Sequence, residues 1–327
     1  MKKVTLLIPC YNEEESLVPL FRAIKTVISS LPQYCWEILF VNDGSHDQTL
    51  SIIKELKNSN PCISYVDLSR NFGKERALLA GFDYATGDCL VIMDADLQHP
   101  PAVVPEMLSW WEQGYDDVYA KRSSRGKESW MRKTMSIFYY KLLDSLSDSN
   151  GGVLKNVGDF RLLSRKCIDA LREMRESERY TKGMYSWIGF KKKEILFDQE
   201  DRIAGESSFS FKRLLNLALD GITSFSVAPL RLSTFLGLFV SAVAFIYMLV
   251  VLFKTVFFGE IVKGFPTLIV VILFLGGVQL LSLGIMGEYV GRIFNESKRR
   301  PVYFVNEYCP DNQEESVCLN QSISEKE

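Results

Sequence analysis

Two aspartates separated by one residue follow an apolar run and form the most chemically suggestive motif of this sequence. Asp94 and Asp96 stand in VIMDADLQHPP, where Gln98 adds a side-chain carbonyl oxygen. In an extended chain, side chains two residues apart point the same way, so both carboxylates can face one place. Such carboxylates repel each other unless a cation lies between them and an anionic ligand, and oxygen donors favour Mg²⁺ or Mn²⁺ together with substrate phosphates. The same triplet also occurs in solvated loops, so its placement in the fold decides its meaning.

The elements that must position these aspartates alternate between strand and helix from the N-terminus to residue 200. Apolar runs predict strands, and the amphipathic segments between them predict helices. The strands are expected at residues 4–8, 36–41, 63–67 and 89–93, and the helices at residues 15–31, 48–57 and 74–85. This alternation predicts an α/β fold with a parallel or mostly parallel sheet covered by helices.

A polar segment follows each of the four predicted strands. The segments are YNEEES, NDGSHD, SRNFGK and DADLQ, in this order. In open α/β sheets, ligands bind in the crevice beyond the carboxyl ends of the strands. We therefore expect the four segments to form one site around Asp94 and Asp96.

The composition favours a cytosolic protein that works at a membrane rather than on nucleic acid. The 327 residues carry a formal net charge of -2, without the clustered excess of Lys and Arg that a phosphate-tracking surface needs. Seven scattered cysteines without a C-x-x-C pair, and only two histidines, indicate reduced thiols rather than disulfides or a zinc site. The N-terminal segment KVTLLIP lacks the features of a signal peptide, so we expect the first domain to stay in the cytosol.

Two long uncharged segments near the C-terminus predict a transmembrane hairpin. Residues 232–253 and 265–287 are each long enough to cross a hydrocarbon core about 30 Å thick. Buried core helices are the alternative, but two such segments joined by a short loop are rare in soluble domains. The flanking basic residues are Lys212, Arg213 and Arg231 before the pair and Arg292, Lys298, Arg299 and Arg300 after it. By the positive-inside rule, both termini are then cytoplasmic.

Two amphipathic segments and a polar tail complete the predicted organisation. Residues 130–146 and 210–222 each have an apolar side, and the second is expected either at the membrane interface or packed on the core. The chain after Pro301 is polar and acidic, and we expect it to be poorly ordered. The predicted division is a catalytic domain at residues 1–209, a juxtamembrane helix at 210–231, a hairpin at 232–288 with spans at about 232–254 and 265–287, and a cytoplasmic tail at 289–327.

Four motifs give the N-terminal part a resemblance to the family 2 glycosyltransferases, which have the nucleotide-sugar-binding A-type fold. They are PCYNEEESL, VNDGSHDQT, RNFGKERALLAGFDYATGD and MDADLQHPP. The later segments VGDFRLLSR, RIAGESSFSF, ITSFSVAPLR and IMGEYVGRIF, with the two predicted spans, are similar to polyprenyl-phosphate glycosyltransferases such as bactoprenol glucosyltransferase and dolichol-phosphate mannose synthase. The likeness extends over nearly the whole chain. It implies a Rossmann-like A-type domain followed by a two-helix transmembrane hairpin.

The resemblance also implies roles for individual residues. Those that match the nucleotide-binding loops are Pro9, Tyr11, Glu13, Val41 and Asp43, and those that match the metal and diphosphate motif are Asp94, Ala95 and Asp96, with Gln98 as an added metal ligand. The expected catalytic set consists of Asp96, of Arg122 and Arg202, which match basic groups near the diphosphate or the acceptor phosphate, and of Asp159, which matches an acidic residue near the reacting sugar.

One position departs from the pattern that the resemblance implies. Ser208 follows the GES triplet where mannose-synthase-like members have a lysine. A phosphate-binding role is therefore unfilled, or it is filled by another cation such as Lys212. We also count Arg161 among the candidates for holding the phosphate.

The resemblance implies an inverting transfer of a hexosyl group, glucose or N-acetylglucosamine, from a UDP-sugar to undecaprenyl phosphate. The expected place is the cytoplasmic face of a bacterial inner membrane, and the expected cofactor is Mg²⁺ or Mn²⁺. The lipid-linked sugar would serve cell-surface glycan modification, with a flippase and a second glycosyltransferase as further partners. No nucleic-acid partner is expected, and glycines in the second span would allow a homo-oligomer.

Two other functions compete with this interpretation. A processive membrane polysaccharide synthase is disfavoured because the sequence has no Q-x-x-R-W motif before its predicted spans. A membrane-tethered nucleotide-sugar-binding protein without turnover is disfavoured by the D-x-D motif and the arginines. A transfer assay separates this second alternative from an enzyme.

Overall fold

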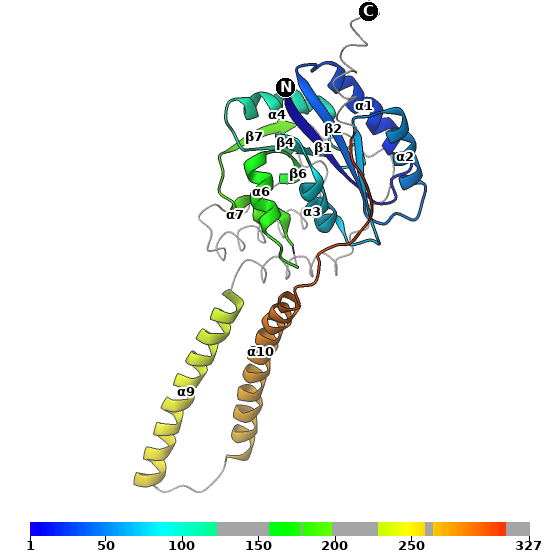
Figure 1. The fold of residues 1–327 in the computed structure, drawn as a ribbon. Coiled ribbons are helices and arrows are strands. Elements are labelled where there is room, and N and C mark those ends of the chain that lie inside the picture. Colours follow the sequence, from blue (N-terminus) through cyan, green and yellow to red (C-terminus); the bar gives the residue numbers. More distant parts are fainter. Residues whose placement is uncertain (123–156, 178, 198–227, 259–263, 312–327) are drawn as a thin grey trace, which may run out of the picture. The chain divides into compact units, whose positions relative to one another are not determined.

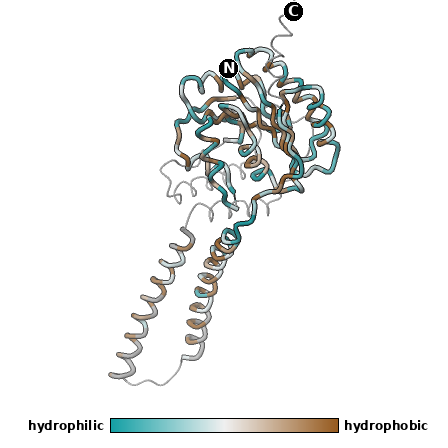
Figure 2. Tube along the Cα trace, viewed as in Figure 1, coloured by the Kyte–Doolittle hydropathy of each residue, from teal (hydrophilic) through white to brown (hydrophobic). Residues whose placement is uncertain are grey.

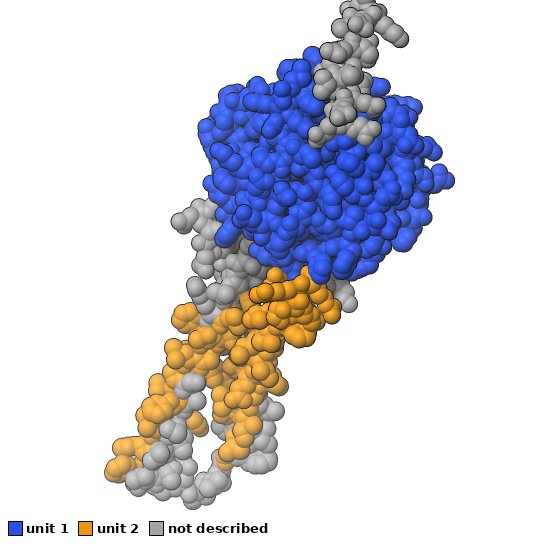
Figure 3. Space-filling view, in the orientation of Figure 1, with its two compact units in different colours: residues 1–144, 149–211, 301–327 blue, residues 145–148, 212–300 orange. Residues whose placement is uncertain are grey.

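The computed structural model describes residues 1–122, 157–177, 179–197, 228–258 and 264–311. The chain divides into two compact units, which Figure 3 distinguishes by colour. The first unit consists of residues 1–144, 149–211 and 301–327, and the second of residues 145–148 and 212–300. The amphipathic segments predicted at residues 130–146 and 210–222 lie outside the described residues.

A mixed sheet of eight described strands forms the centre of the first unit (Figure 1). Its order is β7-β5-β6-β4-β1-β2-β3-β8. The strands are β1 Lys2–Cys10, β2 Tyr34–Asn42, β3 Ile63–Leu68, β4 Cys89–Ile92, β5 Asp117–Arg122, β6 Val157–Ser164, β7 Lys192–Phe197 and β8 Val305–Cys309. The four strands predicted from apolar runs are confirmed as β1 to β4, and they are parallel to one another as expected.

Strand direction gathers most of the carboxyl ends at one edge of the sheet, which we call the carboxyl edge. β6 is antiparallel to its neighbours β4 and β5, and β7 is parallel to β5. The carboxyl ends of β1 to β5 and of β7 therefore share this edge, and the amino end of β6 reaches it from the opposite direction. Ile92 pairs with Arg161 in this antiparallel register, so Asp94, two residues after Ile92, lies opposite Asp159, two residues before Arg161.

Helices cover both faces of the sheet. On one face lie α1 Leu17–Ser29, α2 Thr49–Ser59, the 3₁₀ turn η1 Pro101–Val103 and α4 Val104–Glu112, and on the other lie α3 Lys74–Tyr84, α6 Arg165–Glu173 and α7 Thr181–Trp187. Figure 1 shows α3 and α6 in front of the sheet. Successive side chains of β1 point to opposite faces of the sheet and contribute to two separate hydrophobic cores. Leu6 and Ile8 belong to one core, and Leu7 belongs to the other.

Two long helices make up the described part of the second unit. α9 is Ala228–Phe258 and α10 is Phe265–Ser297, which confirms the predicted pair of helices. Among the described residues, Phe274–Ser297 form a helix long and apolar enough to cross a membrane, and Ser233–Tyr247 form a shorter apolar stretch. Figure 2 shows hydrophobic residues in brown along both helices.

The chain returns to the first unit after α10. β8 pairs antiparallel with β3 and forms one border of the sheet. Glu307 on β8 accepts hydrogen bonds from Lys54 Nζ at 2.6 Å and from Tyr65 Oη at 2.7 Å. The expected poor order after Pro301 is therefore wrong for residues 301–311. A five-residue strand that alternates half-buried and exposed side chains gives little apolar signal in the sequence.

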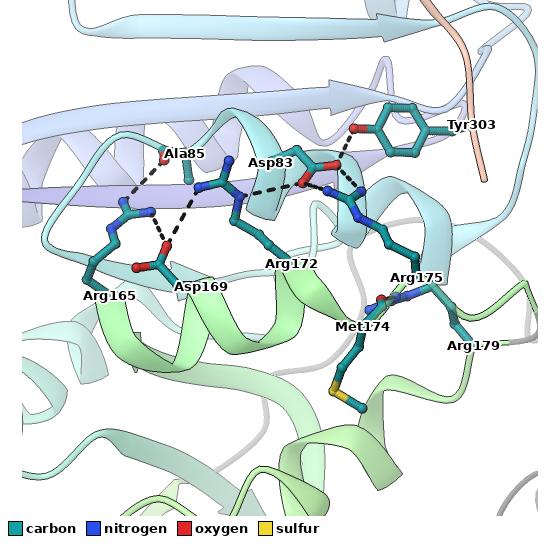
Figure 4. A network of polar contacts seen from close by, with 9 residues as sticks. All are labelled: Asp83, Ala85, Arg165, Asp169, Arg172, Met174, Arg175, Arg179 and Tyr303. Carbon is teal, nitrogen blue, oxygen red and sulfur yellow. Dashed lines mark hydrogen bonds and ion pairs between the residues drawn. The ribbon is translucent and has the colours of Figure 1, made fainter. Parts of the chain in front are cut away.

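A polar network centred on Asp83 fixes this returning segment to α3 and α6 (Figure 4). Tyr303 Oη donates to Asp83 Oδ2 at 2.5 Å, and the two terminal nitrogens of Arg175 each donate to one Asp83 oxygen at 2.6 Å. Arg172 lies nearby, with Nε 3.6 Å from Asp83 Oδ1. Bidentate arginine–carboxylate pairs are among the stronger hydrogen-bonded contacts in proteins. Asp83, at the end of α3, therefore connects three segments that are far apart in the sequence.

The Asp83 network makes a testable contribution to stability. Asp83→Ala would leave the Arg175 guanidinium and the Tyr303 hydroxyl without their common acceptor. We expect the free energy of unfolding to fall by about 1.5–3 kcal/mol in total, since Arg175 is half exposed and its pairing is partly screened. Tyr303→Phe removes one hydroxyl and should cost about 0.5–1.5 kcal/mol. Thermal melting of the full-length chain in detergent measures both effects, and an unchanged melting temperature for Asp83→Ala would contradict the anchoring role.

Candidate active site

The loops after β1 and β2 are tied together at the carboxyl edge. The Asn12 backbone N–H donates to Ser45 Oγ at 3.0 Å, and Asn12 Oδ1 accepts from the His46 backbone N–H at 2.9 Å. The Glu13 backbone N–H donates to Thr49 Oγ1 at 2.8 Å. Asn12 has a φ of 54°, a left-handed conformation that asparagine tolerates. The segments YNEEES and NDGSHD are therefore held side by side, as the sequence predicted for one site.

Asp43 connects the end of β2 to the loop after β3. Its buried carboxylate accepts the backbone N–H groups of Phe72 at 2.7 Å and Gly73 at 2.9 Å. Burial raises the pKa of Asp43 above its ordinary value, although the two amides oppose this shift. Gly44 has a φ of 64°, and a Cβ on it would lie 2.3 Å from the carbonyl carbon of Arg70, so the two loops touch without room for a side chain. The contact of Asp43 with a base or ribose stays a prediction.

The backbone of the D-x-D loop is held by its own side chains. The Asp94 backbone N–H donates to His99 Nδ1 at 3.0 Å, and the Gln98 backbone N–H donates to Asp96 Oδ1 at 3.1 Å. Between them, Leu97 has a φ of 63°, which is uncommon for a bulky residue. Such a conformation costs on the order of 1–3 kcal/mol and persists only where the surroundings impose it. The turn that carries Asp94 and Asp96 is therefore a fixed one.

His99 supports this loop from inside the protein. Its ring is buried and stacks on Phe160, with centroids 4.7 Å apart and 8° between the planes, and Phe197 meets it edge-on at 6.2 Å. Burial lowers the pKa of His99, although Asp94 opposes this shift. The imidazole is therefore neutral at physiological pH, and because Nδ1 accepts the Asp94 amide, its proton is on Nε2. Phe160 follows Asp159 directly, so the stack also links the D-x-D loop to the strand that carries Asp159.

Lys74 lies between two acidic side chains from different strands. Its Nζ is 2.6 Å from Asp94 Oδ1 and 2.9 Å from Asp159 Oδ2. Burial by itself lowers the pKa of Lys74, but the two carboxylates outweigh that effect and raise it above the ordinary value. In return, although burial opposes the charged form, Lys74 holds the pKa of Asp159 well below its usual range. Lys74 and Asp159 are therefore both charged at neutral pH.

The oxygen donors around Lys74 fit a divalent ion. Asp159 Oδ1 is buried and has no hydrogen-bond partner. Asp94, Asp96 and Gln98, which lie close to one another in the sequence, supply further oxygens from the D-x-D loop. Hard oxygen donors of this kind suit Mg²⁺ and Mn²⁺. Within the part of the chain that the structure describes, no three acidic, histidine or cysteine side chains are arranged to hold an ion by themselves. Mg²⁺ is commonly bound by one or two carboxylates, with phosphate oxygens and water as its other ligands.

Several residues predicted to bind the nucleotide lie at or next to the carboxyl edge. Pro9 and Val41 pair with each other near the ends of β1 and β2. Tyr11 follows β1 and is 42% exposed, so its ring is accessible to a ligand. Glu13 lies in the same loop, where its carboxylate accepts the Ser16 hydroxyl at 2.7 Å. Their contacts with a nucleotide stay predictions.

The remaining predicted residues are described only in part. Ala95 is buried between the two aspartates of the motif. Arg122 is the last residue of β5, which places its backbone at the carboxyl edge. Arg202, Ser208 and Lys212 lie outside the described residues. The roles of these arginines stay predictions.

Arg161 lies beneath the site and not in it. The side chain is 2% exposed, Nη1 is 3.1 Å from Asp117 Oδ2, and the guanidinium lies over the Tyr185 ring at 3.6 Å. Our expectation that Arg161 helps to hold a phosphate is therefore wrong, because its charge is paired with Asp117 inside the core. Arg161 is too far inside the protein to reach a ligand at the carboxyl edge, because it lies two residues further from this edge along β6 than Asp159 does.

Among the described residues, Lys74 contacts Asp94 and Asp159 although the sequence alone did not single it out. Lys74 belongs to the predicted segment SRNFGK, but its distance from Asp94 depends on how the loops meet. The sequence did contain one indication of a special role for Lys74. A lysine at the first position of a predicted helix interacts unfavourably with the helix dipole, so contacts outside the helix must stabilise it there. The support that His99 gives to the D-x-D loop is visible only in the structure, through its hydrogen bond with the Asp94 amide and its buried stack on Phe160.

Comparison with known proteins places the two units in known families. A family model described as Glycosyl transferase family 2 matches residues 5–172, and one described as GtrB C-terminal hairpin matches residues 228–293. A prophage bactoprenol glucosyl transferase homolog of Escherichia coli is 44% identical over 93% of this chain and 98% of that protein. The bactoprenol glucosyl transferase of Shigella phage SfV is 43% identical over the same shares. The structure of glucosyl-3-phosphoglycerate synthase from Mycobacterium tuberculosis with Mn²⁺, UDP-glucose and phosphoglyceric acid aligns with a TM-score of 0.46 at 17% identity, covering 68% of this chain and 78% of that chain.

The position of Arg161 predicts a loss of stability upon its replacement. Arg161→Met leaves the Asp117 carboxylate buried without its partner, which typically costs about 3–5 kcal/mol. The melting temperature of the full-length chain in detergent should fall accordingly. Adding Asp117→Leu should restore most of the stability, because a buried ion pair exchanged for apolar residues is often neutral. A stable Arg161→Met variant with a selective loss of phosphate binding would show that Arg161 belongs to the site after all.

Proposed function

The chain belongs to glycosyl transferase family 2, and on that premise we propose that it transfers a glucosyl group from UDP-glucose to undecaprenyl phosphate. One observation carries the proposal. Two proteins named as a bactoprenol glucosyl transferase and its homolog are 43% and 44% identical to this chain over 93% of its length. N-acetylglucosamine is the alternative sugar, and other polyprenyl phosphates are alternative acceptors.

The donor would bind at the carboxyl edge of the sheet. In this proposal Tyr11, Glu13 and Asp43 contact the nucleoside, with Pro9 and Val41 shaping the floor beneath it. Their positions in two loops that are hydrogen-bonded to each other support a preformed pocket. A preformed pocket lowers the cost of ordering a ligand on binding.

The diphosphate would lie against the D-x-D loop. Asp94, Asp96 and Gln98 are proposed to hold Mg²⁺ or Mn²⁺, and Arg122 and Arg202 to add positive charge. When bound, the ion would neutralise charge that grows on the departing UDP, an effect commonly worth several kcal/mol. The fixed turn at Leu97 keeps the two carboxylates ready for this task.

The acceptor phosphate needs little help to become a nucleophile. A phosphomonoester has a second pKa of about 6, so it is largely ionised at neutral pH. Asp159 pairs with Lys74, which holds its pKa well below the usual range and makes the carboxylate a weak base. We therefore infer that Asp159 orients the reactants and does not remove a proton. In-line attack on an α-linked donor would invert the anomeric centre and give a β-linked product.

The membrane hairpin gives the reaction its location. The chain carries the GtrB C-terminal hairpin, which associates it with the membrane. We propose that α9 and α10 span the bacterial inner membrane with the catalytic domain and both termini in the cytoplasm, because basic residues flank the pair. Anchoring the enzyme beside a lipid acceptor raises the effective concentration of that acceptor. A flippase and a second glycosyltransferase would then carry the lipid-linked sugar to the cell surface.

Product analysis tests the proposal directly. The purified full-length chain would be incubated in detergent with undecaprenyl phosphate, Mg²⁺ and a panel of nucleotide sugars, and the lipid products weighed by mass spectrometry. A monoglucosylated lipid phosphate from UDP-glucose is expected. A polymer would indicate a processive synthase, and a product formed only from UDP-N-acetylglucosamine would overturn the choice of sugar.

The D-x-D motif predicts a severe loss of activity upon mutation. Asp94→Ala removes one proposed ligand of the divalent ion, and the loss of one such electrostatic contact typically lowers the turnover number by about 10²–10³. Glu55→Ala, which removes an exposed carboxylate on α2, serves as the control and should leave the rate unchanged. Rates of lipid glucosylation measure both variants. Near wild-type activity of Asp94→Ala would exclude the proposed role of the motif.

A further inference from the structure

Lys74 occupies a position that is electrostatically unusual for a lysine. It is the first residue of α3 and follows Gly73, which has a φ of 94°. The amino end of a helix carries partial positive charge, so a cation there is disfavoured. Helix formation therefore does not explain a lysine at this position. The two carboxylates that it contacts do, since Asp94 and Asp159 lie 2.6 and 2.9 Å from its Nζ.

The ammonium group of Lys74 has more N–H donors than its two carboxylate contacts use. It carries three N–H donors, and two of them point to Asp94 and Asp159. Its side chain remains 42% exposed, so the protein does not enclose Lys74 completely. The third donor has no partner assigned by these two contacts.

The charges around Lys74 indicate which ligand it would take. A divalent ion held by Asp94 and Asp96 would compete with the ammonium group for Asp94, because both are cations that need the same oxygen. Asp159, in contrast, would keep Lys74 at the site through the second contact. The donor released from Asp94 would then face the same crevice as the diphosphate. A lysine ammonium group is a common point-charge partner of phosphate oxygens.

We propose that Lys74 is a phosphate-binding residue that exchanges Asp94 for a phosphate oxygen when the metal binds, while Asp159 retains it. This proposal rests on the proposed function, and it deepens it by assigning the cation whose place Ser208 leaves open. The phosphate oxygen belongs either to the diphosphate of the donor or to the phosphate of the acceptor lipid. The shared chemistry is an anionic oxygen within hydrogen-bonding distance of Nζ.

Replacing Lys74 should strengthen the binding of the metal and weaken the binding of the ligand whose phosphate Lys74 contacts. Lys74→Met keeps the length of the side chain and removes the charge. In the absence of nucleotide, the Mn²⁺ affinity of the full-length chain should rise about tenfold, because a competing like charge is gone. At saturating Mn²⁺, the affinity for UDP should fall about tenfold or more if the partner is the donor diphosphate. If the partner is the acceptor, the KM for undecaprenyl phosphate should rise instead while the affinity for UDP is unchanged.

The experiment measures Mn²⁺ binding by electron paramagnetic resonance and UDP binding by calorimetry, followed by donor and acceptor KM values. Lys54→Met is the matched control, since Lys54 has the same 42% exposure and a 2.6 Å contact with Glu307 away from the site. Lys74→Arg retains the charge and should keep the Mn²⁺ affinity near that of the wild type. Melting temperatures establish that each variant is folded.

The outcomes separate this proposal from the proposed function. A folded Lys74→Met variant in which Mn²⁺ and UDP affinities fall together would indicate a purely structural role and overturn the proposal. The same holds if Mn²⁺ and UDP affinities and both KM values match those of Lys54→Met. If the wild type forms no glucosylated lipid, yet Lys74→Met raises Mn²⁺ affinity and lowers UDP affinity, the proposed acceptor is wrong and the role of Lys74 stands.

Discussion

The arrangement of the site depends on charge compensation among several carboxylates at one edge of the sheet. Asp94, Asp96 and Asp159 are acidic side chains that the fold brings to this edge, and like charges so placed destabilise one another unless a cation compensates. In the described structure Lys74 contacts two of them at once. The same arrangement leaves one oxygen of Asp159 buried and without a hydrogen-bond partner. A site of this kind favours cations, and it favours anionic ligands only after a cation has joined it.

The fold brings this cluster together from three different elements. β4 ends at the D-x-D loop, and the antiparallel β6 brings Asp159 to the same level from the opposite direction. α3 presents Lys74 at its amino end, while Asp83 near its carboxyl end is held by Tyr303 and Arg175. The segment that follows α10 therefore helps to fix the helix whose first residue reaches the site.

Much of this architecture follows from local sequence patterns. The apolar runs that became β1 to β4 are long enough to identify, and the alternation with helices determines that they are parallel. The position of Asp159 could be assigned only through a resemblance, because β6 pairs with strands that are distant in the sequence. Lys74 and Arg161 show most clearly what local sequence patterns cannot predict. Both are basic residues near acidic motifs, and only the register of β6 and the contact between loops reveal that Lys74 lies in the site while Arg161 lies under it. β8 was missed for a related reason, since its stability comes from pairing with β3 and from contacts such as Glu307 with Lys54.

The most direct test is an experimental structure of the full-length chain with Mn²⁺ and UDP-glucose bound. We expect the ion between the diphosphate and the carboxylates of Asp94 and Asp96, with Lys74 Nζ still paired to Asp159 and turned away from Asp94. An ion and diphosphate bound elsewhere, with Asp94 still paired to Lys74, would contradict the proposed metal and diphosphate site.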